Sequence, residues 1–139
     1  MFIKPNELNT HIYDYQLSQI TESDTSLVQS AISAAIDEVK GYLSTHYDTH
    51  QIFAAEDDER NSLVLEFCKT VAVWRIVKLA NVDMLYSRYR ELYLDTISYL
   101  RMVSEGKLAL DLPRLTDSEG QPSGGTLRIK SNKKFNHYI

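Results

Sequence analysis

The chain has 139 residues, of which 43% are hydrophobic and 24% charged, and its formal net charge is −4 at pH 7. A chain of this size and composition buries roughly two thirds of its unfolded surface, which excludes disorder throughout and favours one domain. It has neither an apolar run of about 18 residues nor a signal-peptide layout, so we expect a cytoplasmic protein without a membrane partner. The single cysteine, Cys68, excludes an internal disulfide and a thiolate zinc cage.

The charge is divided unevenly along the chain. All 19 acidic residues lie at or before Glu119, so residues 1–125 carry a net charge of −8 and residues 126–139 carry +4. An acidic body repels duplex phosphates, which disfavours specific DNA recognition by the folded part. The basic residues near the C-terminus are the candidates for phosphate contacts: Arg128, Lys130, Lys133 and Lys134.

Two short helical stretches are predicted first, over residues 5–11, with Pro5 in a first-turn position, and over residues 13–20. A helix of about 20 residues is predicted after residues 22–25, several of which could cap it, because apolar residues recur there at steps of three and four. Glycine inside such a helix costs about 1 kcal/mol relative to alanine, so we expect Gly41 to mark a close helix contact. The apolar stripe consists of Val28, Ile32, Ala35, Ile36, Val39 and Leu43.

Residues 46–55 break this period and are predicted to form a loop with two apolar anchors, Ile52 and Phe53. The acids at 57–59 favour a helix N-terminus, which is electropositive. Residues 63–80 are apolar on nearly every side, which is typical of a central helix covered by the other helices or by a neighbouring subunit.

Two charges interrupt this apolar helix, Glu66 and Arg75. Either they pair with groups on other helices or across a subunit interface, or they form a solvated edge beside Lys69 and Lys78.

A break at 81–83 precedes a third long helix, predicted over 83–104 and ended by Gly106 in a left-handed cap. Tyr86, Tyr89 and Tyr93 share one side of it, a pattern that favours a core edge or a subunit interface, because tyrosine combines apolar area with a wet hydroxyl. The expected inner stripe is Leu85, Tyr89, Leu92, Tyr93, Ile97, Leu100 and Val103.

The chain changes character after Lys107. Alternating leucines before Pro113 predict a short extended segment, which proline prevents from continuing as a helix. We therefore expect an all-α fold, with a helical domain over 1–113 made of three long helices and short N-terminal ones, a flexible linker over 114–125 and an extended arm over 126–139. The arm alternates at its start and ends in aromatic residues, which suits docking on a partner. Its candidate subunit contacts are Leu127, Ile129, Phe135, Tyr138 and Ile139.

No catalytic constellation is visible. His46 and His50 flank Asp48 at a spacing that suits a metal only with further ligands, so we interpret both as exposed loop histidines. Cys68 lies in the most apolar stretch and is expected to be a buried thiol of raised pKa. With neither a glycine-rich phosphate loop nor a serine elbow, we expect no enzyme activity, no cofactor and no metal.

Several short motifs in order resemble a family of small helical proteins of Mu-like phages and prophages. They are AAIDEVKGYLS at 34–44, YD at 47–48, IFA at 52–54, RNSLVL at 60–65, AVW at 72–74 and LDLP at 110–113. This family, long described as a domain of unknown function, is placed with the head–tail connector (adaptor) proteins. The resemblance covers about residues 1–113, and the part after Thr116 looks like an extension found in some members only.

The resemblance implies a structural virion protein that assembles as a ring between the portal and the tail or stopper proteins, with DNA passing through. It further implies localisation in the virion, and in the host bacterial cytoplasm during assembly. Residues 116–139, which comprise most of the linker and the whole arm, span on the order of 80 Å when fully extended, enough to reach a neighbouring subunit. The alternative is a bacterial regulatory or adaptor module that binds a protein partner, or nucleic acid, through the arm.

Overall fold

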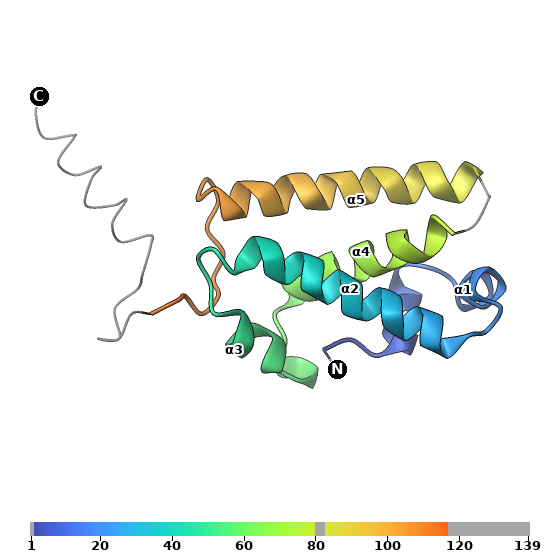
Figure 1. Cartoon of the computed structure of the whole chain (residues 1–139), viewed down its shortest axis with the longest axis horizontal. Helices are drawn as coiled ribbons and strands as arrows, with labels where there is room; N and C mark the ends of the chain where they lie inside the picture. The colour runs from blue at the N-terminus through green and yellow to red at the C-terminus, as the bar shows by residue number, and fades with distance from the viewer. Residues whose placement is uncertain (1, 80–82, 117–139) are drawn as a thin grey trace, which may run out of the picture.

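Three long helices form the bundle, and of the shorter helices α1 lies near one end of α2 and α3 near the other (Figure 1). The structure is a computed structural model and describes residues 2–79 and 83–116. The fold is all-α, as predicted. In chain order the elements are the 3₁₀ helix η1 (Pro5–Thr10), α1 (Asp14–Thr21), α2 (Thr25–Leu43), α3 (Thr49–Ala54), the 3₁₀ turn η2 (Asp57–Glu59), α4 (Ser62–Val77) and α5 (Asp83–Ser104).

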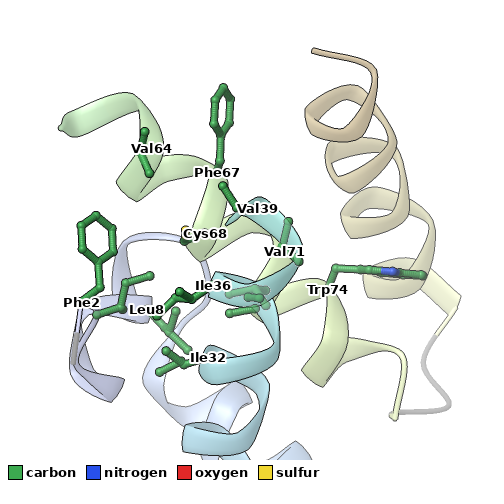
Figure 2. Close-up of a cluster of buried hydrophobic side chains, with 14 of the residues drawn as sticks. Phe2, Leu8, Ile32, Ile36, Val39, Val64, Phe67, Cys68, Val71 and Trp74 are labelled. Atoms are coloured by element: carbon green, nitrogen blue, oxygen red, sulfur yellow. The ribbon is translucent and has the colours of Figure 1, made fainter. Parts of the chain in front are cut away.

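Helix α4 is the central element, as its apolar sequence predicted. It packs against α2, α5, α1 and η1, so few of its side chains reach solvent. Figure 2 shows its side chains meeting those of α2 and of the N-terminal segment in one cluster, to which Phe2, Leu8 and Ile36 belong. The α4 residues with no exposed surface are Val64, Cys68, Val71, Ala72, Val73, Ile76 and Val77.

Local capping fixes where the helices begin. The Asp24 carboxylate accepts a hydrogen bond from the Ser26 amide at the start of α2. The Asn61 side chain accepts from the Leu63 and Val64 amides, both at 3.0 Å, at the start of α4. A side-chain oxygen that satisfies these free amides is what an N-cap requires. The acids at 57–59 therefore precede α4 as the separate turn η2 and do not form its first turn.

The prediction of a loop over residues 46–55 was wrong in part, because α3 lies within it. Asp48 caps this short helix by accepting from the Gln51 amide. Ile52 is buried as expected, and Phe53 is half-buried with its ring centroid 4.8 Å from that of Phe2.

Two expectations about helix faces were also wrong. A Cβ at Gly41 would meet nothing within 4 Å, so no close helix contact explains this glycine. Leu92 is 42% exposed and does not belong to the inner stripe of α5. Among the described residues, helix α5 packs mainly on α4 and α2, which makes its buried stripe narrower than the sequence pattern suggested.

The end of α5 follows the prediction closely. Gly106 has φ 78°, its amide donates to Val103 O at 3.1 Å, and the Lys107 amide donates to Met102 O at 2.9 Å. This pair of hydrogen bonds is a Schellman motif, in which glycine accepts the left-handed conformation without cost from a Cβ.

The segment after α5 is fixed to the turn between α2 and α3. Pro113 O accepts from the Asp48 amide at 2.8 Å, the Leu115 amide donates to His46 O at 3.2 Å, and Tyr47 pairs with Arg114 in an isolated antiparallel bridge. The Leu110 amide donates to the Tyr47 hydroxyl at 2.7 Å. The predicted extended segment thus closes one end of the bundle.

His46 corrects the expectation of exposed loop histidines. It is only 5% exposed, and its Nε2 lies 3.1 Å from Ser104 O. The hydrogen bond from the Leu115 amide to His46 O holds His46 beside the end of α5. His50 is exposed on α3.

Arg60 ties the N-terminal segment to the turn before α4. Its two terminal nitrogens donate to both carboxylate oxygens of Glu7, at 2.9 and 2.8 Å, and its Nε donates to Asp57 O. The Arg60 guanidinium holds the pKa of Glu7 down at about 2, well below its usual 4.5. Both side chains are largely shielded from solvent, so this bidentate pair is stronger than an ordinary surface ion pair.

We predict that Glu7→Gln lowers the free energy of unfolding by about 2 kcal/mol at pH 7, because Arg60 loses its charged partner. The pKa of Glu7 is lower in the folded than in the unfolded state, so its contribution is complete above pH 4.5 and is lost as the pH falls toward 2. Urea unfolding at pH 7 and pH 3 should therefore show a smaller difference between variant and wild type at pH 3. An equal difference at both values would contradict the assignment.

Candidate assembly surface

The tyrosines of α5 join this helix to the rest of the chain. Tyr89 is buried and its hydroxyl donates to His11 O at 2.6 Å, while the Tyr93 hydroxyl donates to Glu38 Oε2 at 2.7 Å. Burial, with the neighbouring Glu38 carboxylate, raises the pKa of Tyr93 to about 12. Both residues form the edge of the core, one of the two interpretations that the sequence favoured.

Tyr86 differs from the other two tyrosines because 41% of its surface is exposed. Its ring packs edge-on against Trp74, with centroids 5.0 Å apart, while Tyr93 stacks on the same indole at 5.7 Å. A role at a subunit interface stays a prediction for Tyr86, Tyr89 and Tyr93, and Tyr86 has the most side-chain surface free for it.

The charges within α4 pair with other elements of the same chain. Arg75 Nη2 donates to Glu38 Oε1 of α2 at 2.6 Å, and Glu66 contacts His11 Nε2 at 2.9 Å. Glu38 thus accepts from both Arg75 and Tyr93, and it connects α2, α4 and α5 through one carboxylate.

The two lysines beside these charges differ in their exposure to solvent. Lys69 is 6% exposed, and its Nζ reaches Thr10 Oγ1 at 3.3 Å, whereas Lys78 is exposed. The solvated edge suggested by the sequence is therefore found at Lys78 and at Glu66, whose side chain is 54% exposed although it contacts His11.

The outward side of α5 carries apolar side chains with no neighbour in the described chain that buries them. Leu94 is 42% exposed and Met102 40%. They are eight residues apart, about 12 Å along the helix axis and within one half of its circumference. We call these two residues the α5 outer face. Single exposed apolar residues are common on protein surfaces, but two on the uncovered side of one helix suit a contact with another chain.

A groove lies on another side of the bundle. One wall is formed by α3 and the chain that follows it as far as Asn61, and the other by residues 111–113. The groove encloses about 540 Å³ and is lined by ten residues: Gln51, Ile52, Ala54, Ala55, Glu56, Glu59, Asn61, Asp111, Leu112 and Pro113. We call it the acidic groove, because three carboxylates and no cation line it. Sequence reasoning missed this groove, since only the fold brings residue 111 beside residues 56 and 59.

One of the remaining predicted sites is confirmed, and several others lie outside the residues that the structure describes. Cys68 is buried, and burial raises the pKa of its thiol as expected. Within residues 2–79 and 83–116, no cluster of three or more histidine, cysteine or acidic side chains has the arrangement to hold a metal ion. Residues 81 and 82 of the predicted break at 81–83 lie outside the described residues. So do the arm candidates Leu127, Ile129, Phe135, Tyr138 and Ile139, and the basic Arg128, Lys130, Lys133 and Lys134.

No helix in the described part of the chain is both long and apolar enough to cross a membrane. The fold and surface of the described residues define a small all-α bundle with an uncovered helix face and an acidic groove.

Comparison with protein families identifies this bundle as a phage protein. The family model described as "Bacteriophage Mu, Gp36" matches residues 2–129, nearly the whole chain, so the protein belongs to this family. The match extends past residue 113, where the sequence resemblance ended, into the predicted linker and the start of the arm. Neither the curated proteins nor the solved structures gave a significant match.

We predict that Tyr93→Phe lowers the free energy of unfolding by about 1 kcal/mol, the typical contribution of one such hydrogen bond. Trp74 is the single tryptophan of the chain and stacks on Tyr93, so its fluorescence follows the same unfolding transition. Tyr13→Phe is the matched control, because Tyr13 is 68% exposed, and it should change stability by less than about 0.5 kcal/mol. Equal effects of the two variants would contradict the role given to the Tyr93 hydroxyl.

Proposed function

We propose that this phage protein is a head–tail connector (adaptor) subunit that assembles as a ring between the portal and the tail or stopper proteins. The observation that carries the proposal is the presence of two different surfaces, the α5 outer face and the acidic groove beside α3. Helices α5 and α3 lie on opposite sides of α2 and α4 in the view of Figure 1. A closed ring needs contacts of this kind, in which one patch of a subunit meets a different patch of the next.

Charge supports the second part of the proposal, the passage of DNA. The 19 acidic residues all belong to the part of the chain before the arm, and an acidic wall repels duplex phosphates and lets DNA slide without sequence-specific binding. We assign the subunit a structural role in the virion, with assembly in the host cytoplasm and without catalysis.

The α5 outer face gives the first test of this proposal. In the double variant Leu94→Asp, Met102→Asp, we expect the ring population, measured by native mass spectrometry in the presence of the portal, to fall at least tenfold, equivalent to about 1.4 kcal/mol per contact. Ser33→Asp, a single exposed change on α2, controls for an added charge on a helix and should leave assembly unchanged. A folded double variant that assembles as well as wild type would contradict a contact through α5.

The arm gives the second test. A chain that ends at Thr116 keeps all the helices described here, and we expect it to lose the oligomer in the same measurement, because its link to the neighbouring subunit is removed. A truncated chain with unchanged oligomer and unchanged attachment to the portal would contradict a role of the arm in assembly.

A further inference from the structure

The acidic groove combines an apolar floor with unneutralised negative charge. Ile52, Leu112 and Pro113 supply apolar surface, and Glu56, Glu59 and Asp111 supply three carboxylates. Both glutamates and Asp111 are exposed at the rim. This is the layout of a site for an extended peptide, whose apolar side chains occupy the floor while its cations meet the rim.

Cations close to the groove are engaged elsewhere. Arg60 donates to both oxygens of Glu7 and to Asp57 O. Lys40 lies over the Phe53 ring and Arg114 over the Tyr47 ring, each 5.3 Å from the ring centroid. None of the three is among the groove-lining residues, so the rim charges are left for a ligand.

The chain itself contains a segment of matching chemistry. Residues 126–139 have no acidic residue and carry four cations among apolar and aromatic side chains. The alternation of Leu127, Arg128, Ile129 and Lys130 would place apolar and basic groups on opposite sides of an extended peptide, as a floor and a charged rim require.

We propose that the acidic groove binds the arm, residues 126–139, of a second copy of this chain. The inference rests on the proposed function, because it names the contact by which neighbouring subunits join. The groove is formed partly by the chain that leads to the arm, and the Pro113–Asp48 and Leu115–His46 hydrogen bonds fix that chain in place. In Figure 1 the described chain then ends, in orange, pointing away from the bundle. The arm of the same chain would have to turn back to reach the groove, whereas the arm of a neighbour can enter directly.

The experiment measures binding of a fluorescein-labelled peptide of residues 126–139 to the full-length protein by fluorescence anisotropy. The groove variant is Glu56→Lys, Glu59→Lys, Asp111→Lys, and the matched control is Asp37→Lys, Glu91→Lys, Asp95→Lys, which makes the same charge change at exposed positions on α2 and α5. We expect the groove variant to weaken peptide binding at least tenfold and the control to change it less than twofold. Phe135→Ala with Tyr138→Ala in the peptide should weaken binding to the wild-type protein as well.

Other outcomes would overturn the inference. Equal binding to the groove and control variants, each confirmed as folded by circular dichroism, would show that the peptide follows net charge alone. A second full-length variant, Arg128→Glu, Lys130→Glu, Lys133→Glu, Lys134→Glu, removes the basic charge of the arm. Binding of the peptide to this variant but not to wild type would show that the wild-type grooves are already occupied. If native mass spectrometry finds that wild type is then a monomer, each groove holds its own arm and the inference is wrong.

Failure of this inference can be separated from failure of the proposed function. If a ring forms with the portal but the groove variant binds the peptide as tightly as wild type, the connector assignment stands and the arm does not bind in the groove. If the groove variant weakens peptide binding but the chain forms no ring with the portal, the connector assignment is wrong. The interaction between copies of the chain then still stands.

Discussion

The burial of α4 is the constraint on which the rest of the structure depends. A helix that is apolar on all sides is stable in water only when other elements cover its whole circumference. Here α2 and α5 cover two sides, and η1 and α1 cover a third. Each fully buried aliphatic side chain on α4 contributes roughly 1.5–3 kcal/mol, so a chain that failed to close around this helix would lose most of its stability.

Polar groups around α4 hold these covering elements in register. Glu38 joins α2 to α4 and α5, Tyr89 joins α5 to the N-terminal segment, and Arg60 joins that segment to the turn before α4. These side chains are engaged by hydrogen bonds inside the bundle. The uncovered side of α5 and the acidic groove are the surfaces of the described residues on which we place the proposed contacts with other copies.

Much of the helical framework could be predicted from the sequence, because it follows from local periodicity and capping. The bounds 83–104 of α5 and the Gly106 cap were predicted correctly, as was the central position of α4. The errors concern residues whose burial or exposure depends on contacts with distant parts of the chain. His46 is buried because the chain near Leu115 and the end of α5 enclose it. Leu92 is exposed because no element within residues 2–79 and 83–116 covers that edge of α5.

The candidate site was harder to predict than the fold. Tyr86, Tyr89 and Tyr93 were found from helical spacing, but spacing did not reveal that Tyr89 and Tyr93 bond within the chain. The acidic groove had only a weak local signal, the acids at 56–59, and its third carboxylate comes from a segment about fifty residues later in the chain. Pockets formed by residues so far apart depend on the tertiary packing, which no pattern of neighbouring residues contains.

The most direct test of the connector assignment is a cryo-electron microscopy reconstruction of the portal–tail junction in the parent phage particle. Our account requires density for a ring of this subunit between the portal and the tail, with α4 enclosed in every copy and the DNA path along an acidic inner wall. A junction in which this chain is absent, or occurs as a single copy without a ring, would contradict the account.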